Sequence, residues 1–278
     1  MVANKVRSLL SRNSAIIMGI LNVTPDSFSD GGQYSAPEAA LKHALELQEQ
    51  GADIIDIGGE STRPGAAKVD EQEELDRVIP IVELLSRHSD VAISIDTYKP
   101  LVMQEAIAAG ASMINDVNGL RDKSALAIAA QFQVPVCLMH MQGSPTTMQA
   151  SPKYQNVLHE ICEFFIERIE CCSRAGISKS DIVIDPGIGF GKTLEHNLEL
   201  LANLEQLTKS TACKILVGVS RKSLIDMLLN RAVDERLPAS IGLAVQSVLN
   251  GAKIVRVHDV RASFDAIRAV EAVSRQVK

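Results

Sequence analysis

The sequence predicts an α/β fold of the (β/α)8 TIM-barrel type, and two observations carry that prediction. Eight short apolar runs each end on a polar or ionisable residue that opens a loop, and segments of helical pattern separate these runs. A parallel strand buried on both faces reads as a continuous apolar run, so the polar residue marks where the strand leaves the core. The expected strands are residues 16–22, 54–56, 92–96, 113–115, 136–140, 182–185, 215–220 and 254–258.

The segments between these runs carry the start and stop signals of helices. The stretch SAPE at 35–38 combines the spacing of a capping box with a proline in the first helical turn. Gly51 stands where a left-handed C-cap is favoured, and glycine ends the helical pattern in the same way at 110, 176 and 251. Strands and helices therefore alternate along the chain.

Spacing predicts how many units the chain holds. Successive strand ends lie roughly 20 to 45 residues apart, and one strand–helix–strand crossover takes about 30. Eight units fill the 278 residues, so we expect one barrel domain over 1–278, with 1–14 as an N-terminal extension. An open doubly wound sheet is the alternative. In the fifth strand, Pro135 has to stand at the start to be tolerated.

The connections that follow the strands are longer than those that precede them. Residues 22–35, 58–70 and 140–152 form long strand-to-helix segments. Active sites of (β/α)8 barrels are built from these loops at the carboxyl ends of the strands. The glycines and prolines in the first two loops allow them to order over a ligand. The polar strand ends therefore predict an active site on one face.

Composition excludes several classes of protein. A formal charge of −6 and the lack of a basic and aromatic stripe argue against nucleic-acid binding. No apolar stretch approaches the roughly 20 residues of a membrane span, so we expect no membrane insertion. The five cysteines are odd in number and form no C-x-x-C pair. Buried thiols in a reducing compartment are favoured, which predicts a cytoplasmic protein.

Eight stretches over nearly the whole chain resemble the dihydropteroate synthase family, whose pterin site lies in a TIM barrel. They are NVTPDSFSDGG (22–32), GGESTRPGA (58–66), SIDTYKP (94–100), INDV (114–117), MHMQG (139–143), DPGIGFGK (185–192), SRKS (220–223) and RVHDV (256–260). The resemblance implies an enzyme that joins 6-hydroxymethyl-7,8-dihydropterin diphosphate to 4-aminobenzoate and releases pyrophosphate in folate biosynthesis. It also implies a homodimer and a sulfonamide target.

Three residues at strand ends resemble the family's pterin contacts: Asp185, Asp96 and Asn115. A pterin presents a ring N–H beside an exocyclic amino group, and one carboxylate can accept both bonds. Asp185, which precedes a Pro-Gly turn, is the expected acceptor, and Asn115 offers both a donor and an acceptor. Asp56 and Asp116 either join these contacts or orient loops.

The resemblance assigns the diphosphate to Arg63, Arg256 and His258. Departure of this group requires positive charge and hydrogen-bond donors where negative charge grows. Arg256 and His258 alternate along the last strand, so we expect both side chains on the same side. The resemblance further implies a Mg²⁺ ion on the diphosphate, with Asn22 as its protein ligand. Magnesium usually keeps several waters and takes other ligands from substrate phosphates.

The aminobenzoate is expected between the second long loop and the segments beyond the sixth and seventh strands. Phe190 with Thr62 and Pro64 would form the slot for the flat ring, because an aromatic face offers stacking. Phe28 is plausible in the same slot. Ser223 is the candidate donor to the aminobenzoate carboxylate.

Asp96, Asp185 and Lys222 are the expected catalytic residues of a carbocation-like displacement at the pterin methylene. The two carboxylates would stabilise positive charge spreading into the pterin. Lys222 would reach the pterin carbonyl edge, because the helix dipole disfavours a cation at the start of a helix without such a task. Its neighbour Arg221 is equally compatible with a structural role.

Two other functions remain open at this point. A pterin-binding barrel methyltransferase would act on a methylated folate with a corrinoid partner, and Arg63, Arg256 and His258 argue against it. A catalytically silent relative would have lost site residues, and none is lost here. Thr146 and Asn156 depart from the family pattern and affect the details of one loop or a dimer surface. His140 is expected to be structural.

Overall fold

The computed structural model describes residues 3–23, 36–61, 68–143, 148 and 152–276. Eight parallel strands close into a barrel in chain order, which confirms the (β/α)8 barrel and rejects the open sheet. The strands are β1 (Ile16–Asn22), β2 (Ile54–Gly58), β3 (Ala92–Asp96), β4 (Met113–Asp116), β5 (Val136–Met139), β6 (Ile182–Asp185), β7 (Lys214–Val217) and β8 (Ala252–Val257).

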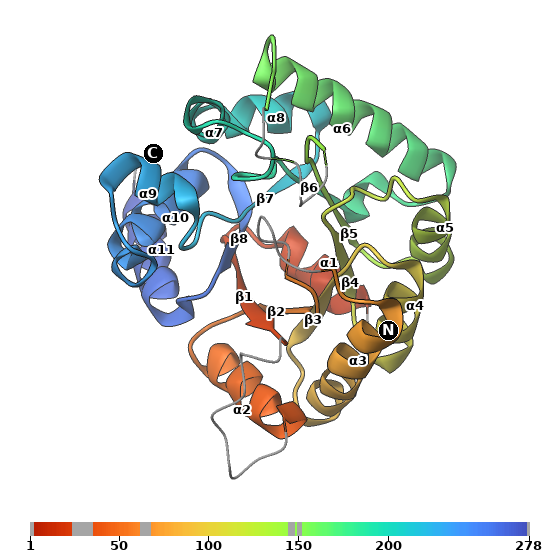
Figure 1. Cartoon of the computed structure of the whole chain (residues 1–278). Helices are drawn as coiled ribbons and strands as arrows, with labels where there is room; N and C mark the ends of the chain where they lie inside the picture. Colours follow the sequence, from red (N-terminus) through yellow and green to blue (C-terminus); the bar gives the residue numbers. More distant parts are fainter. Residues whose placement is uncertain (1–2, 24–35, 62–67, 144–147, 149–151, 277–278) are drawn as a thin grey trace.

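The helices form a ring around these strands (Figure 1). They are α1 (Ala3–Ser11), α2 (Ala36–Glu49), α3 (Glu71–His88), α4 (Pro100–Ala109), α5 (Lys123–Phe132), α6 (Val157–Arg174), α7 (Leu194–Ala202), α8 (Leu204–Thr211), α9 (Ser223–Leu229), α10 (Leu237–Leu249) and α11 (Val260–Ser274), with the short 3-10 turns η2 (Lys179–Asp181) and η3 (Val233–Glu235). None of the described helices is both long and apolar enough to span a membrane.

Each expected strand is present, with small differences at the ends. β7 stops at Val217, three residues before the expected end, because a turn from the Val219 carbonyl to the Lys222 amide redirects the chain. β5 stops at Met139, yet the His140 amide still donates to the Asp185 carbonyl at 3.0 Å. Pro135 lies immediately before β5, the one place where its missing N–H costs no ladder bond.

The barrel interior is apolar and is closed at its amino-terminal end by α1. Val6, Leu9 and Leu10 of this helix pack against inward-facing residues from all eight strands. Arg7 donates from Nε to Asp181 at 2.9 Å and joins α1 to the turn before β6. Residues 3–11 are therefore built into the barrel floor, and polar ligands have only the opposite, carboxyl end.

Glycine ends the helices as predicted. Gly51 has φ +109 and lies so close to Phe264 that a Cβ would approach that ring to 2.5 Å. Gly110 has φ +124 and is the C-cap of α4. Only glycine adopts this backbone without strain, so these short turns keep the helix-to-strand connections tight.

Candidate active site at the carboxyl ends of the strands

Four strand ends bring polar side chains together at the mouth of the barrel. Arg256 on β8 donates from Nε to Asp56 Oδ2 and from Nη2 to Asp96 Oδ2, each at 2.6 Å. Asn115 on β4 donates to the same Asp56 oxygen at 3.1 Å. Three predicted residues thus meet in one cluster, and Asp56 lies inside the cluster instead of orienting a loop.

Burial sets the electrostatics of this cluster. The remaining oxygens, Asp56 Oδ1 and Asp96 Oδ1, are buried and have no hydrogen-bond partner among the described residues. Burial raises the pKa of Asp96 to about 7, against the opposing charge of Arg256. Burial disfavours the charged form of Arg256, but the two carboxylates outweigh that effect and raise its pKa. Two acceptors without donors suit a ligand that brings N–H groups.

Asp185 supplies a further carboxylate from β6. Its side chain is buried, and Oδ1 accepts a hydrogen bond from the Gly187 amide at 2.8 Å. Burial raises its pKa, whereas the nearby Lys222 and the Gly187 amide act in the opposite direction. The Pro-Gly turn therefore orients the carboxylate by one oxygen, and the second oxygen is not used by that turn.

Lys222 lies between Asp185 and the aromatic ring of the loop after β6. It is the N-cap residue of α9 and makes no side-chain cap. Its Nζ donates to the Ile188 carbonyl and lies 4.6 Å from the centroid of Phe190. Burial lowers the pKa of Lys222 to about 8, and the charge of Asp185 opposes the shift. The structure thus brings Lys222, Phe190 and Asp185 together.

An apolar wall, which sequence reasoning missed, lines another part of the mouth. Val117, Met139, Met141 and Met148 form a buried cluster, with Tyr98 and Phe190 packed against it. Methionine fills irregular apolar surfaces and makes favourable contacts with aromatic rings. The wall is suited to the face of a flat heterocycle. The only sequence signal was methionine concentrated directly after the fifth strand.

The remaining predicted rim residues have separate partners. His258 follows β8 and lies with Nδ1 3.0 Å from Ser220 Oγ, whereas Arg256 points to the carboxylates. Arg221 has φ +58 and donates from Nε to Asp259 at 2.9 Å, so it supports the turn before α9. Ser223 is the first residue of α9 and is exposed.

Asn22 ends β1, with an exposed side chain opposite Gly58 of β2. Among the described residues, no group of three or more His, Cys, Asp or Glu side chains could hold a metal. One amide oxygen fits an ion that keeps most of its waters and shares the phosphate oxygens of a substrate. The chemistry of Asn22 is therefore compatible with Mg²⁺ only when the diphosphate is bound.

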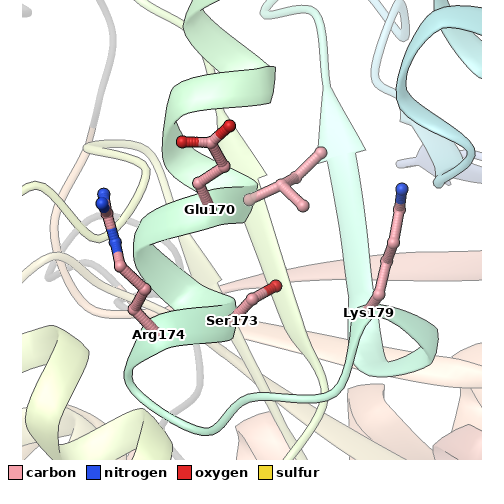
Figure 2. A pocket seen from close by; sticks show the side chains of 5 residues that line it. Glu170, Ser173, Arg174 and Lys179 are labelled. Atoms are coloured by element: carbon pink, nitrogen blue, oxygen red, sulfur yellow. The ribbon is translucent and has the colours of Figure 1, made fainter.

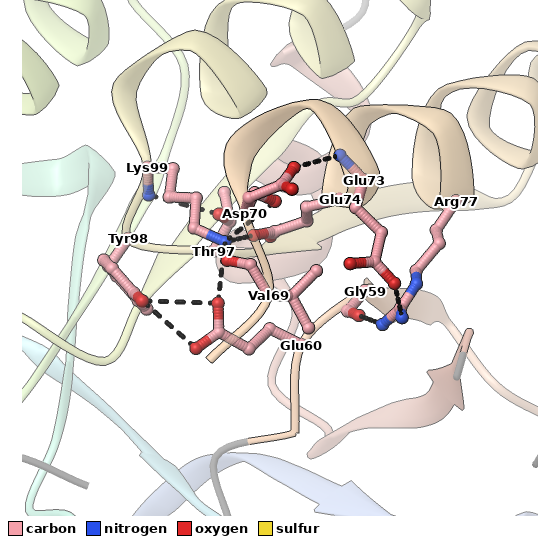
Figure 3. Close-up of polar contacts among 10 residues, drawn as sticks. All are labelled: Gly59, Glu60, Val69, Asp70, Glu73, Glu74, Arg77, Thr97, Tyr98 and Lys99. Carbon is pink, nitrogen blue, oxygen red and sulfur yellow. Dashed lines mark hydrogen bonds and ion pairs between the residues drawn. The ribbon is translucent and has the colours of Figure 1, made fainter. Parts of the chain in front are cut away.

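A partly buried ion-pair network joins the segments on either side of the second long loop (Figure 3). Lys99 Nζ donates to Glu60 Oε2 at 2.7 Å, to Glu74 Oε2 at 2.6 Å and to the Val69 carbonyl at 2.6 Å. The Tyr98 hydroxyl donates to Glu60 at 3.1 Å. Sequence reasoning missed this network. Lys99 is the N-cap of α4, and a lysine at the start of a helix was the available signal.

Several predicted residues lie outside the described part of the chain. Thr62, Arg63 and Pro64 fall between Glu60 and Val69, both of which Lys99 contacts. The other two are Phe28 and Thr146.

Two further residues, Asp116 and Asn156, serve the packing around the site. Asp116 accepts bonds from the Asn118 and Leu120 amides at 2.7 and 2.8 Å, so it orients the loop after β4. Burial raises its pKa to about 6 against these bonds. Asn156 accepts from the His159 amide at 2.9 Å and caps α6, which gives this departure from the family pattern a structural role.

A separate hollow of about 450 Å³ lies away from the mouth of the barrel, and Figure 2 shows the side chains that line it. Glu170, Ser173, Arg174 and Lys179 line it with Ile169, between the end of α6 and η2. Because η2 immediately precedes β6, this hollow lies toward the amino end of that strand. It therefore belongs to the face opposite the polar strand ends.

The similarity to known proteins covers the part of the chain that carries the site residues. The model of the family described as pterin binding enzyme matches residues 18–258. Dihydropteroate synthase of Escherichia coli (strain K12) is 52% identical over 92% of this chain and 90% of its own length. That of Haemophilus influenzae is 47% identical over 93% and 94%.

Solved structures agree in fold as well as sequence. Yersinia pestis dihydropteroate synthase in a sulfonamide drug complex has a TM-score of 0.89 and 51% identity, covering 96% of both chains. The Xanthomonas albilineans enzyme in complex with 7,8-dihydropteroate has a TM-score of 0.86 and 44% identity, covering 94% of both. Both the sequence and the fold place this chain among these enzymes. The chain therefore belongs to the pterin binding enzyme family, in its dihydropteroate synthase branch.

Proposed function

We propose that the mouth of the barrel joins 6-hydroxymethyl-7,8-dihydropterin diphosphate to 4-aminobenzoate, giving 7,8-dihydropteroate and pyrophosphate. The observation that carries this proposal is the group of buried carboxylates at the strand ends: Asp56, Asp96 and Asp185, with Arg256 and Asn115 among them. Buried acceptors left unpaired stabilise a ligand only if it supplies several N–H donors. A pterin supplies such donors along one edge.

We assign the pterin to Asp96, Asn115 and Asp185, beside the apolar wall. Asp185 presents the oxygen that Gly187 does not use, and Asp96 presents its unpartnered Oδ1. Lys222, held by the Ile188 carbonyl above Phe190, is placed for the carbonyl edge of the heterocycle. The flat ring of the aminobenzoate would stack near Phe190, with Thr62, Pro64 and Ser223 around it.

In the proposed displacement, the methylene carbon–oxygen bond breaks and pyrophosphate leaves with the electron pair. The arylamine nitrogen then forms the new carbon–nitrogen bond and loses a proton to solvent. Positive charge that spreads into the pterin as the bond ionises is stabilised by the carboxylates of Asp96 and Asp185. Arg63, Arg256 and His258 are assigned to the leaving diphosphate, and Arg256 would approach it while held by the Asp56 and Asp96 carboxylates.

We assign Asn22 to a Mg²⁺ ion carried by the diphosphate. The ion would neutralise charge that develops on the leaving oxygens. Asn22 is exposed at the end of β1, where an ion shared with a substrate can reach it.

Removal of the Asp185 charge tests the proposal. We expect the purified chain to release pyrophosphate only when pterin diphosphate, 4-aminobenzoate and Mg²⁺ are all present. Asp185→Asn should lower kcat/KM by about 10²- to 10³-fold, as for loss of one preorganised contact to the transition state. Asp90→Asn, whose side chain is fully exposed, is the matched control and should retain activity. Methyl transfer from a methylated folate to a corrinoid, without pyrophosphate release, would overturn the proposal.

We also propose a cytoplasmic homodimer. Five cysteines without a disulfide support a reducing compartment. Five exposed apolar side chains lie on α9, η3 and the start of α10, which follow one another in the chain, and we call them the α9–α10 patch: Met227, Leu228, Leu229, Val233 and Leu237. An exposed apolar patch of this kind is typical of a protein interface.

Charge placed in the patch tests the dimer. Leu229→Glu should convert a dimer into a monomer, because a buried carboxylate without a partner is costly at an interface. Size-exclusion chromatography with light scattering measures the mass, and Leu101→Glu on α4 is the control with a similar substitution. A wild-type chain that is monomeric at all concentrations, or a Leu229→Glu variant that stays dimeric, would rule out this patch.

A further inference from the structure

Lys192 is a buried cation beside the active site, and none of the substrate contacts assigned above uses it. Its side chain is only 2% exposed. Nζ lies 3.1 Å from His140 Nδ1, 3.3 Å from the His140 carbonyl and 2.9 Å from the Phe190 carbonyl. The three donors of the ammonium group therefore have three acceptors. Burial lowers the pKa of Lys192 to about 7 and the charge of Asp185 opposes that shift, so the ammonium group, satisfied in this way, is charged in the acidic range.

His140 is the acceptor that fixes Lys192 in place. Burial, with the charges of Lys192 and Arg121, lowers the pKa of His140 to about 2, so the ring is neutral. A neutral ring that accepts at Nδ1 carries its proton on Nε2. The His140 ring packs edge-on against the Phe164 ring, with 4.9 Å between the ring centroids, and this contact holds its orientation. His140, which follows β5 and has no assigned substrate contact, thus holds Lys192 in place.

The contacts of Lys192 with His140 and Phe190 also fix the turn at residues 187–190, which holds active-site side chains. Lys192 ties the backbone at His140 to the backbone at Phe190, which ends the turn formed by residues 187–190. A Cβ on Gly187 would lie 2.0 Å from the His140 carbonyl, so this turn is pressed against the end of β5. Within it, the Gly187 amide holds Asp185, and the Ile188 carbonyl holds Lys222.

Lys192 also acts on Asp185 through its charge. The groups that face Asp185 come from every neighbouring element: Lys192 from its own loop, Lys222 from the segment after β7, Arg256 from β8, and Cys137 and His140 from β5 and its end. Burial disfavours the ionised carboxylate, and the positive charges of Lys222, Lys192 and Arg256 oppose that effect. Of these three cations, only Lys192 has no assigned substrate contact.

We propose that Lys192 is a positioning residue for the pterin site: its ammonium group, held by His140 and Phe190, orders residues 187–190 and keeps Asp185 ionised. This inference rests on the proposed function, because it takes the Asp185 carboxylate to bind the pterin. It assigns to Lys192 an effect on binding that is separate from any loss of folding.

The test is the pH dependence of kcat/KM for the pterin diphosphate in Lys192→Met and Lys192→Gln. Loss of a nearby positive charge should move the acid limb to higher pH by about one unit in both variants, because Asp185 then ionises less readily. The glutamine side chain keeps neutral N–H donors for the Phe190 carbonyl. Lys192→Gln should therefore be more active than Lys192→Met at high pH. Lys179→Met, on the opposite face of the barrel, is the control and should leave the profile unchanged.

An acid limb at the wild-type position in active Lys192 variants would overturn the inference. If Lys192→Met does not fold, Lys192→Gln carries the test, with circular dichroism as the check of folding. His140→Gln, which keeps a neutral acceptor, should leave the acid limb in place, and an upward shift there would also contradict the inference. Failure of the proposed function is distinguishable, because the wild-type chain itself would then release no pyrophosphate.

Discussion

Arg256 shows how one residue can have a different local task from the one that its position in the sequence suggests. The family resemblance assigns it to the diphosphate, whereas the structure pairs it with Asp56 and Asp96. The guanidinium is pre-oriented by two fixed carboxylates, so little reorganisation remains when a charged ligand arrives. The positive charge of Arg256 opposes the repulsion between the Asp56 and Asp96 carboxylates, which acts to raise the pKa of Asp96.

Arg256→Met should destabilise the fold, and more strongly at high pH. Two buried carboxylates lose their cation, so we expect the free energy of unfolding to fall by about 3–5 kcal/mol at pH 8. The pKa of Asp96 is already raised by burial and would rise further. A carboxyl group whose pKa is higher in the folded than in the unfolded state stabilises the fold at pH values below its unfolded pKa. This contribution is lost as the pH rises through its folded pKa.

The loss of unfolding free energy in Arg256→Met should therefore be smaller at pH 5 than at pH 8. Urea denaturation at the two pH values measures it. Arg87→Met breaks an exposed pair with Glu83 on α3 and should cost less than about 1 kcal/mol at either pH. Equal losses at both pH values in Arg256→Met would show that Asp96 does not take up a proton.

At the scale of elements, the ends of β2, α3 and α4 meet at Lys99. Glu60 follows β2, Glu74 lies in the first turns of α3, and Lys99 precedes α4 (Figure 3). Glu74 is 1% exposed, and its second oxygen is buried without a partner among the described residues. The Glu74 carboxylate has Lys99 as its cation, so this one side chain joins the charged groups of three elements that also pack against one another.

Lys99→Met should lower the free energy of unfolding by about 3 kcal/mol, because Glu74 would be left as an unpaired buried charge. We also expect a higher KM for 4-aminobenzoate with little change in pterin diphosphate binding, since Lys99 contacts both ends of the segment that carries Thr62, Arg63 and Pro64. Steady-state kinetics with each substrate varied in turn measure this. Lys68→Met, exposed in the same segment, is the control. Equal increases in KM for 4-aminobenzoate and for the pterin diphosphate would contradict a role of Lys99 that is limited to this loop.

For the whole molecule, stability and chemistry lie at opposite ends of the barrel. α1 seals the amino end with apolar side chains, and the polar strand ends occupy the carboxyl end. Figure 1 shows the ring of helices around the strands. The interior between them is apolar, so polar groups at the mouth are shielded from water on one side. A change in the floor should therefore alter stability without altering the chemistry.

Leu10→Ala tests this separation. The side chain is 3% exposed under the barrel, so its truncation should cost about 2–5 kcal/mol of unfolding free energy. We expect kcat/KM to stay within about twofold of wild type below the melting transition. Thermal denaturation and steady-state rates at low temperature measure the two effects. A large fall in kcat/KM at a temperature where the variant is fully folded would contradict it.

Local physical chemistry determined much of this protein from the sequence. Continuous apolar runs predicted the strands, glycines such as Gly51 predicted the helix ends, and the repeat of these units predicted the barrel. Polar residues at the carboxyl ends of strands predicted the place of the site, because parallel strands bring all these ends to one edge. Asp96, Asn115 and Asp185 were found by this logic, and the family resemblance identified the chemistry.

The tertiary structure alone decided which of these residues face one another. Asp56 and Asp96 lie on the neighbouring strands β2 and β3, whereas Arg256 comes from β8 near the end of the sequence, and its contact with them depends on the closed barrel. The contact of Lys192 with His140 likewise depends on two loops packed together. Sequence spacing carries information within one element, whereas burial and pairing of charges depend on how elements pack. The eight polar strand ends were therefore predictable, but their division into ligand contacts, ion pairs and supports was not.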